Sequence, residues 1–242
     1  MSIVGLLHPG EMGAAVGQCL LSRGHTVRWA SPGRSPATAA RAGGFDDVGS
    51  VAEVAARADV ILSICPPHAA LDVARDVAGF GGLYVDANAV SPATAREAAA
   101  IIEDGGGTFV DGGIIGGPPG ESGPGPRLYV SGDAAEALLP LKQWGIDLRP
   151  IPGGIGAASA LKMSYAGITK GLIALGSAMA LGASQSGAAA ALRAELASSQ
   201  PDILRMLDRG VPGIHFYCLN RVPSCSQVLH NLGLAKDGEG VD

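Results

Sequence analysis

Charged residues are scarce in this chain, and runs of basic residues are absent. The 242 residues include 17 Lys and Arg and 22 Asp and Glu, which give a formal net charge of -5, and charged residues make up 16% of the composition. Nucleic-acid binding needs clustered Lys or Arg to neutralise phosphates, so we do not expect nucleic acid as a partner. Hydrophobic residues at 47% exclude a disordered protein, because disordered chains lack the apolar side chains that form a core.

Cysteine is also rare, and its spacing forms no redox or metal motif. The four cysteines, Cys19, Cys65, Cys218 and Cys225, include no CxxC pair, so we expect reduced thiols in a cytoplasmic protein. The N-terminus begins directly on an apolar segment without a charged region or a cleavage site, and we therefore expect no export signal.

A single segment has the length and apolar character of a membrane span. Residues 166–183 contain Lys170 as their one charged residue, but they are rich in Gly, Ala and Ser rather than in Leu and Ile. Small residues are typical of a helix that packs closely on its neighbours, so we expect a core helix and no membrane partner.

Strand and helix patterns alternate through the first 150 residues. Buried strands are predicted over 60–65, 83–88, 108–115 and 127–131. Ser91-Pro92 begins a predicted helix that ends near Glu103, and Asp133 is a candidate N-cap for a helix that ends at Trp144. This alternation predicts an α/β domain with a parallel sheet covered on both faces and a ligand at the carboxyl ends of the strands.

The pattern becomes helical after Pro152. Residues 156–199 contain neither proline nor strand-like alternation, which predicts one long helix and a second, and residues 202–209 predict a third. We place the domain junction near Gly153-Gly154. The composition changes again after Val211. A zinc site there is a weaker alternative, because no metal-ligand spacing links His215, Cys218, Cys225 and His230.

The first 34 residues have the order strand, glycine turn, helix, strand. Ser2 to Leu7 is an apolar run, HPGEMG follows at once, residues 14–23 form an amphipathic helix, and residues 26–30 form a second strand. A dinucleotide pyrophosphate binds to this arrangement because backbone N–H groups at a helix N-terminus face the anion. His8 stands where the first glycine of the GxGxxG fingerprint is expected. The candidate cofactor-binding residues in this turn are His8, Pro9, Gly10, Glu11, Met12 and Gly13.

The second strand ends without the acid that holds the ribose hydroxyls in NAD-binding proteins. Ser31, Arg34 and Ser35 follow it, and the first carboxylate comes at Asp46. A hydroxyl and a guanidinium at this place suit a 2′-phosphate, so we expect NADP(H) as the cofactor.

Five motifs in order resemble the β-hydroxyacid dehydrogenase superfamily, which includes 6-phosphogluconate and 3-hydroxyisobutyrate dehydrogenases. They are GLLHPGEMG, the strand ending in Cys65-Pro66-Pro67, DANAVSPATA from Asp86, DGGIIGGPPGESG from Asp111, and GxxxxxKM from Gly156 to Met163. The resemblance covers residues 1 to 210. It implies a Rossmann doubly wound parallel sheet in residues 1–153, an all-helical C-terminal domain in residues 154–242, and a homodimer formed through the helical domain.

The resemblance implies a catalytic role for Lys162, at the position of the lysine that donates or accepts the proton at the substrate oxygen. A carbonyl that gains hydride develops alkoxide character, and a nearby cation stabilises it and supplies the proton. A helix-surface lysine with a solvated head is the alternative. Lys170, two turns further along nearly the same helical face, is the lysine most easily confused with Lys162.

Several positions depart from the superfamily pattern. Its asparagine one turn after the lysine is Ala166 here, its serine before the paired glycines is Ile115, and its Ser-Thr pair is Asn88-Ala89. These changes predict a substrate other than an ordinary small 3-hydroxy acid, with a less polar arm against Ile115.

The remaining candidates retain alternative interpretations. Gly116 and Gly117 present backbone N–H groups for a carboxylate or form a tight turn, and Tyr165 supplies a hydroxyl or is a buried core residue. The resemblance places Cys65, Pro66 and Pro67 beside the nicotinamide, and Asn88 beside both cofactor and substrate.

We therefore expect an NADP(H)-dependent oxidoreductase that transfers hydride between the nicotinamide and a hydroxyl or carbonyl substrate. An imine reductase is a rival, although such enzymes generally carry Asp or Tyr at the proton-donor position. A nucleotide-binding protein without turnover is another. Members of the superfamily run longer and end in further helices, so the change in composition after Pro212 leaves open a truncated or altered C-terminus.

Overall fold

The computed structural model describes residues 2–118, 126–144 and 146–208. Its contacts divide the chain into two compact units, residues 1–167 and 168–242, and the division falls within the long helix α6 (Ala157–Gln185). The predicted junction at Gly153-Gly154 lies just before this helix. The residues of the zinc hypothesis, His215, Cys218, Cys225 and His230, lie outside the described residues.

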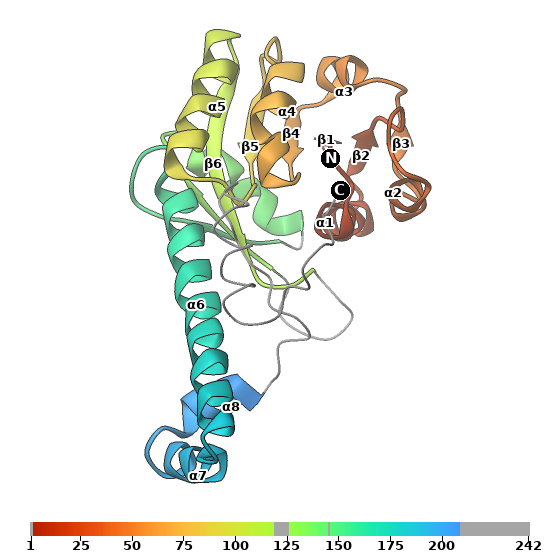
Figure 1. The fold of residues 1–242 in the computed structure, drawn as a ribbon. Helices are drawn as coiled ribbons and strands as arrows, with labels where there is room; N and C mark the ends of the chain where they lie inside the picture. Colours follow the sequence, from red (N-terminus) through yellow and green to blue (C-terminus); the bar gives the residue numbers. More distant parts are fainter. Residues whose placement is uncertain (1, 119–125, 145, 209–242) are drawn as a thin grey trace, which may run out of the picture. The chain divides into compact units, whose positions relative to one another are not determined.

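Unit 1 is built on an eight-stranded sheet in the order β3-β2-β1-β4-β5-β6-β7-β8 (Figure 1). The strand order runs outward in both directions from β1 and β4, which is the doubly wound arrangement that the sequence predicts. The strands are β1 (Ile3–Leu6), β2 (Thr26–Trp29), β3 (Asp46–Asp47), β4 (Val60–Ser63), β5 (Leu83–Asp86), β6 (Thr108–Ile115), β7 (Arg127–Ser131) and β8 (Asp147–Pro150).

The predicted parallel sheet is confirmed over most of its width, and one pair of strands departs from it. The strands β3 to β6 pair in parallel, but β7 runs antiparallel to β6, with Gly112 opposite Val130. Only a short segment joins β6 to β7, too little for the helical crossover that a parallel pair needs. The two-residue β3 and the edge strand β8, whose pattern is polar, were not predicted.

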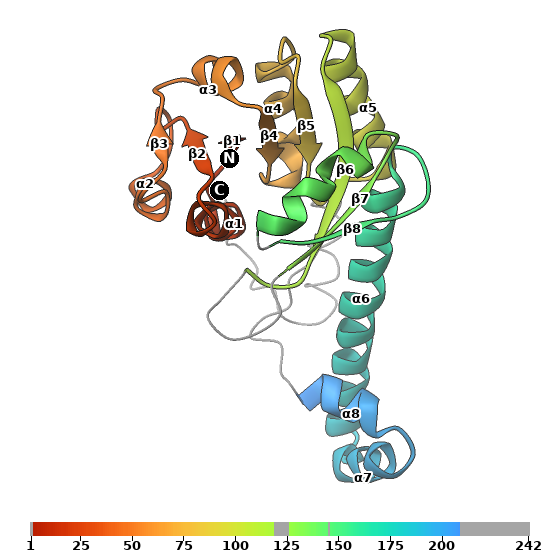
Figure 2. The same ribbon diagram turned by 180° about the vertical axis from the view of Figure 1, so that it is seen from behind.

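Helices cover both faces of the sheet (Figures 1 and 2), and each face has its own apolar core. Along the strands, alternate side chains enter alternate cores, as when Ile61 and Leu62 point to opposite faces. One core includes residues of α3 (Val51–Arg57), α4 (Ala70–Asp76) and α5 (Pro92–Asp104). The other includes residues of α1 (Glu11–Ser22), the turn after α2 (Pro36–Arg41) and the 3-10 segment Ala135–Trp144. A further 3-10 turn, Pro67–Ala69, precedes α4.

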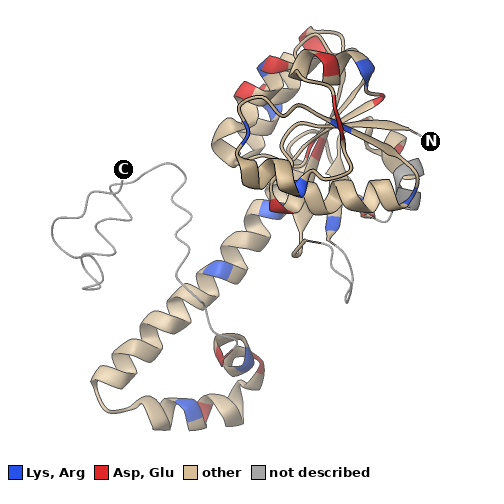
Figure 3. Ribbon diagram, turned by 90° about the vertical axis from the view of Figure 1, so that its right-hand side faces the viewer, with Lys and Arg blue, Asp and Glu red and all other residues tan. Residues whose placement is uncertain are grey.

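The helix α6 is far more exposed than a core helix. Only Ala158 and Ser159 are buried among its 29 residues, so the expectation of a core helix for residues 166–183 is wrong for a single chain. Its length and mean hydropathy of 1.4 would suffice to cross a membrane, a criterion that many helices of other proteins also meet. Figure 3 shows the helix almost free of charged residues.

The described part of unit 2 continues α6 into α7 (Ala189–Ser199) and α8 (Pro201–Asp208). Leu207 of α8 packs against Gly176 so closely that a Cβ at Gly176 would lie 2.4 Å from the leucine side chain. Arg193 of α7 pairs with Asp208 of α8. The three predicted helices are therefore present, with bounds close to those expected.

Candidate functional site

The carboxyl ends of β1, β4, β5 and β6 lie side by side in the sheet and carry most of the predicted site residues. Asp86, the last residue of β5, is level with Asp111 of β6, so β6 continues beyond this edge to Ile115. The sheet order reverses between β1 and β4, and open α/β sheets bind ligands at such a reversal. Most of the predicted site residues thus follow or end strands at the carboxyl edge of the sheet.

The glycine turn between β1 and α1 has the two properties that a pyrophosphate requires. Gly10 is the N-cap of α1, no side chain caps it, and a Cβ there would meet no atom within 4 Å. A Cβ at Gly13 would lie 2.4 Å from the carbonyl oxygen of His8, so only glycine allows the helix to approach the turn this closely. Pro9 is buried, Glu11 is exposed, and Met12 packs on the adjacent core.

His8 and Arg34 form a close pair at this turn. Nη1 of Arg34 lies 2.6 Å from Nε2 of His8, and Nη2 of Arg34 donates to the carbonyl oxygen of Leu7 at 3.0 Å. Burial and the adjacent Arg34 charge lower the pKa of His8 to about 4, so the imidazole is neutral near pH 7 and accepts the arginine N–H. Arg34, a predicted cofactor residue from the segment after β2, therefore reaches the glycine turn itself.

Ser31 is held by a carboxylate that sequence reasoning missed. Oδ1 of Asp47, from β3, accepts the backbone N–H groups of Ser31 at 3.2 Å and of Gly49 at 3.0 Å. A hydrogen bond from the Ser31 side chain, together with these backbone hydrogen bonds, holds the pKa of Asp47 below its usual value. The expected acid is thus absent from β2, but a neighbouring strand brings one to its end. A two-residue strand gives no periodic pattern by which to find it.

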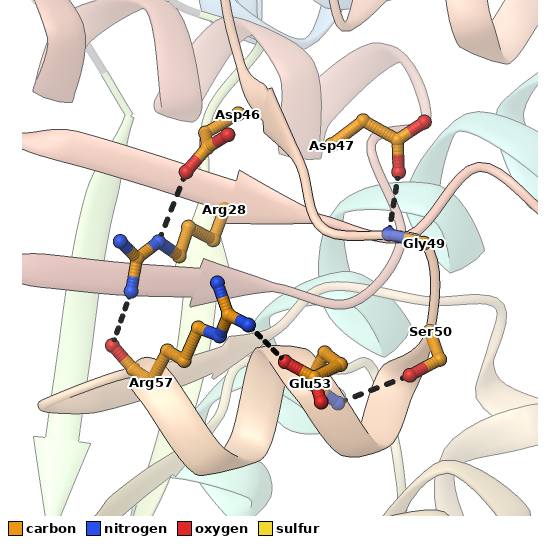
Figure 4. Close-up of polar contacts among 7 residues, drawn as sticks. All are labelled: Arg28, Asp46, Asp47, Gly49, Ser50, Glu53 and Arg57. Atoms are coloured by element: carbon orange, nitrogen blue, oxygen red, sulfur yellow. Dashed lines mark hydrogen bonds and ion pairs between the residues drawn. The ribbon is translucent and has the colours of Figure 1, made fainter.

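A hydrogen bond from Arg28 joins the edge of the sheet next to this carboxylate to α3 (Figure 4). Nε of Arg28 lies 3.1 Å from a carboxylate oxygen of Asp46, and Nη1 of Arg28 donates to the carbonyl oxygen of Arg57. Arg57 also pairs with Glu53 one turn earlier, and Ser50 caps the helix. Asp46 is therefore an ion-pair partner of Arg28. Ser35, another predicted cofactor residue, caps α2 by accepting the N–H of Thr38.

Asn88 connects the ends of β4 and β5. Its Oδ1 accepts the N–H of Cys65 at 2.6 Å, and its Nδ2 donates to the hydroxyl of Ser63 at 3.0 Å. Since Asn88 is 2% exposed, these bonds fix the start of the Cys65-Pro66-Pro67 loop in place. Burial is the main cause that raises the pKa of the Cys65 thiol to about 11, so Cys65 is a neutral thiol near pH 7.

Asp86 is a buried carboxyl group next to this connection. Its Oδ1 accepts the N–H of Asn88 at 2.9 Å, whereas its buried Oδ2 has no hydrogen-bond partner among the described residues. Burial, and to a lesser extent the charge of Asp111, raise the pKa of Asp86 to about 6.

Asp111 fastens the start of α6 to the sheet. Its Oδ2 accepts the N–H groups of Gly156 at 2.9 Å and Ser159 at 3.0 Å and the hydroxyl of Ser131 at 3.0 Å, and its Oδ1 accepts the Ser159 hydroxyl at 2.5 Å. The Ser131 oxygen also accepts the N–H of Ala158. A carboxylate at a helix N-terminus satisfies N–H groups that have no partner within the helix.

Lys162 lies about one helical turn after Ser159, which is bonded to Asp111. A Cβ added at Gly113 of β6 would be 3.0 Å from Cβ of Lys162 and 2.9 Å from the carbonyl oxygen of Ala158. The absence of a side chain at Gly113 therefore lets α6 lie directly on β6, two residues past the level at which β5 ends. Lys162 is partly exposed there, whereas Lys170 belongs to unit 2.

The other predicted substrate residues differ in their surroundings. Ile115 is 4% exposed and ends β6. Gly116 has a φ of +122°, which favours the tight-turn interpretation at that residue, and a Cβ at Gly117 would meet no atom within 4 Å. Tyr165 is 45% exposed, so the core interpretation of this tyrosine is wrong. Ala166, where the superfamily has asparagine, is partly exposed.

The residues at the sheet edge fit a dinucleotide better than a metal ion. Nδ1 of His8 and Nε of Arg34 are buried nitrogens without a hydrogen-bond partner in the described part of the chain, and both lie at the glycine turn. An anionic phosphate would supply the missing acceptors. No group of three or more His, Cys, Asp or Glu residues suited to a metal occurs within the described ranges.

Known proteins share sequence with this chain. Residues 2–139 match the family model for the NAD binding domain of 6-phosphogluconate dehydrogenase. A probable 3-hydroxyisobutyrate dehydrogenase of Mycobacterium tuberculosis is 31% identical over 170 residues, 66% of this chain and 55% of the relative. The chain spans about half the length of the curated relatives it matches.

Two solved structures share the fold over nearly the whole chain. A conserved protein of unknown function, described as similar to 3-hydroxyacid dehydrogenases, has a TM-score of 0.73 and 29% identity, covering 98% of this chain and 92% of its own. An imine reductase of Myxococcus stipitatus has a TM-score of 0.70 at 20% identity, covering 100% and 81%, a likeness of fold alone. The family match, the sheet order and the glycine turn agree, and the chain belongs to the β-hydroxyacid dehydrogenase superfamily, with an NAD-binding domain of the 6-phosphogluconate dehydrogenase type.

Proposed function

We propose that this protein is an NADP(H)-dependent oxidoreductase that acts on a hydroxyl or carbonyl substrate, with Lys162 as the proton donor and acceptor. The observation that carries the proposal is the placement of Lys162 over Gly113, just beyond the carboxyl edge of the sheet that holds the glycine turn. When bound, the nicotinamide supplies or receives the hydride, and the protein contributes binding, orientation and the proton.

Three elements would hold the cofactor. The open backbone at Gly10 and the N-terminus of α1 receive the pyrophosphate, and the loop fixed by Asn88 borders the nicotinamide. Ser31 and Arg34 favour the additional 2′-phosphate of NADP, because a guanidinium is permanently charged and binds phosphate oxygens through paired N–H groups. The nearby Asp47 carboxylate opposes this preference in part.

Lys162 would act on the substrate oxygen. In the reduction direction, the ammonium group donates a hydrogen bond to the carbonyl oxygen and transfers a proton as hydride reaches the carbon. In the oxidation direction, the neutral amine removes the hydroxyl proton. The buried Ile115 at the end of β6 supports a substrate with an apolar arm.

Two alternative functions are separated from this one by their substrates. An imine reductase is supported by the likeness of fold to the Myxococcus stipitatus enzyme, and it would reduce cyclic imines better than carbonyl compounds. A nucleotide-binding protein without turnover would bind NADPH and reduce neither class.

We also propose a cytoplasmic homodimer. The apolar side chains along the exposed α6, among them Ile168, Leu172 and Leu175, are 49 to 62% exposed in the single chain. A contiguous apolar face of this kind is covered in most soluble proteins, and the Gly and Ala residues between these side chains permit close packing of a second helix.

The decisive experiment combines cofactor titration with steady-state assays. NADPH and NADH are titrated by fluorescence, and the parent and Lys162→Ala are then assayed with a panel of 3-hydroxy acids, carbonyl compounds and cyclic imines. We expect Lys162→Ala to bind NADPH as the parent does and to lose at least about a hundredfold in kcat, the usual range for removal of a general acid.

Lys170→Ala is the matched control, since this lysine lies on the same helix in unit 2. It should retain the parent kcat. Equal turnover by the parent and Lys162→Ala would contradict the catalytic assignment, and a parent that binds NADPH but reduces no member of the panel would favour the binding protein.

A further inference from the structure

We propose that His8 is a positioning residue that holds Arg34 at the glycine turn as a phosphate-binding group for the dinucleotide. This proposal rests on the proposed function, because it takes a dinucleotide as the ligand. The shared chemistry is a phosphate dianion or diester, either the 2′-phosphate of NADP or the pyrophosphate common to both nicotinamide cofactors. His8 thereby acquires a role that a glycine at the same place in the fingerprint does not have.

The geometry fixes the guanidinium at two points. Nη1 of Arg34 meets Nε2 of His8 at 2.6 Å, and Nη2 donates to the carbonyl oxygen of Leu7 at 3.0 Å. Leu7 and His8 are the two residues directly after β1, so the segment that forms the turn also orients the guanidinium. Two such contacts remove most of the rotamer freedom of a long side chain before the ligand arrives.

The charge of Arg34 is left available for an anion. Among the ion pairs of the described residues, none includes Arg34. Its partner at the turn, His8, is neutral near pH 7 because burial and the Arg34 charge lower the pKa of the imidazole to about 4. A carboxylate at position 8 would neutralise the arginine, whereas a neutral acceptor orients it and leaves its positive charge in place.

Unused donors point to the same kind of ligand. When Nε2 of His8 accepts from Arg34, the hydrogen of the neutral imidazole is on Nδ1, and this buried atom has no acceptor among the described residues. Nε of Arg34 is buried and lacks an acceptor in the same region. Buried donors without acceptors are costly, and phosphate oxygens would satisfy both.

The experiment compares NADPH and NADH affinity, by fluorescence titration, in the full-length parent and four variants. Arg34→Ala removes the guanidinium that is proposed to bind the phosphate. His8→Leu removes the acceptor at similar side-chain size, and His8→Gln restores an acceptor oxygen on a side chain of comparable reach. Arg28→Ala is the matched control, since it removes an arginine from β2 whose contacts are with Asp46 and Arg57. Thermal unfolding of each variant confirms that it is folded at the assay temperature.

The expected result is a selective change in NADPH binding. Arg34→Ala should weaken it roughly tenfold or more, which is the value of one hydrogen bond to a charged group. His8→Leu should weaken it by about threefold to tenfold, His8→Gln should stay within about twofold of the parent, and Arg28→Ala should leave the NADPH to NADH ratio unchanged. A structural effect alone would change both nucleotides and would not be rescued by glutamine.

Other outcomes separate the claims. Equal losses for NADPH and NADH in Arg34→Ala and His8→Leu, with parent-like binding of both nucleotides in His8→Gln, would support the positioning role at the pyrophosphate and overturn the proposed preference for NADP. A loss in Arg34→Ala with parent-like binding in His8→Leu would overturn the positioning role and leave the proposed function intact. A parent that binds neither nucleotide would overturn both.

Discussion

The carboxylate of Asp111 accepts both the backbone N–H and the hydroxyl of Ser159, at 3.0 and 2.5 Å, three residues before Lys162. This carboxylate also accepts hydrogen bonds from the backbone N–H of Gly156 and the hydroxyl of Ser131, and it is fully buried. The start of α6 is thus determined by one side chain from the middle of β6. The position of Lys162 depends on that attachment.

Asp111→Ala should therefore destabilise the protein and displace Lys162. Four hydrogen bonds to one carboxylate are lost and buried donors are left without an acceptor, so we expect a loss of about 3 to 5 kcal/mol in the free energy of unfolding. Urea denaturation followed by circular dichroism measures it. Asp104→Asn, at the exposed end of α5, should change stability by less than about 0.5 kcal/mol. Comparable stability of Asp111→Ala and the parent would argue against the attachment of α6 through Asp111.

Gly10→Ala and Gly13→Ala should both impair NADPH binding, but for different reasons. The methyl group at position 13 would meet the His8 carbonyl oxygen at 2.4 Å, so the turn must distort and the melting temperature should fall. The methyl group at position 10 enters open space, so Gly10→Ala should fold like the parent while blocking the approach of the pyrophosphate. Thermal melts paired with NADPH titration separate the two effects, and an unimpaired Gly10→Ala would show that the phosphate lies elsewhere.

Asp86 and His8 should act in opposite directions on stability between pH 4 and 6. The folded protein holds the Asp86 proton more tightly than the unfolded chain, since the pKa rises from 3.8 to about 6, so this contribution to stability is lost as pH rises through that range. The His8 pKa falls from 6.5 to about 4, so its contribution is lost as pH falls through that range.

Asp86→Asn should remove the Asp86 contribution and leave the pH dependence of stability that His8 causes. Relative to the parent, the variant should gain up to about 3 kcal/mol in the free energy of unfolding between pH 4 and 6, because a shift of one pKa unit corresponds to about 1.4 kcal/mol. Denaturant titrations at pH 4, 5, 6 and 7 measure the difference, and Asp104→Asn again serves as the control. Parallel curves for the parent and Asp86→Asn would refute a buried, protonated carboxyl at this position.

Leu172→Glu should dissociate the proposed dimer. The side chain is 49% exposed in the single chain, and a charge placed within an apolar interface would lack a partner. Light scattering after gel filtration should give the mass of a dimer for the parent and of a monomer for the variant. Ser198→Glu on the exposed α7 should remain dimeric, and a monomeric parent would remove the basis for this proposal.

The sequence predicts those features that recur with a period or a motif. The strands of the central sheet, the helix that begins at Ser91-Pro92 and the glycine turn follow from apolar alternation, capping chemistry and the fingerprint, and all are present. The two-residue β3 gives no alternation to detect, and its Asp47 becomes a partner of Ser31 only when the strands pair.

Other features depend on contacts between residues far apart in the sequence. The antiparallel β7 and the attachment of Asp111 to Ser159, 48 residues later, arise from tertiary pairing. The exposure of α6 is equally invisible in its composition, because a helix rich in alanine and glycine looks the same whether its own chain or another molecule covers it.

The close approach at Gly113 and the attachment at Asp111 both precede Gly167, the last residue of the first unit. Lys162 consequently belongs to the same compact unit as the strand ends that carry the glycine turn. A motion of the second unit alone would leave the attachment of Lys162 to the sheet unchanged, so the proposed proton donor and the glycine turn would keep their relative positions.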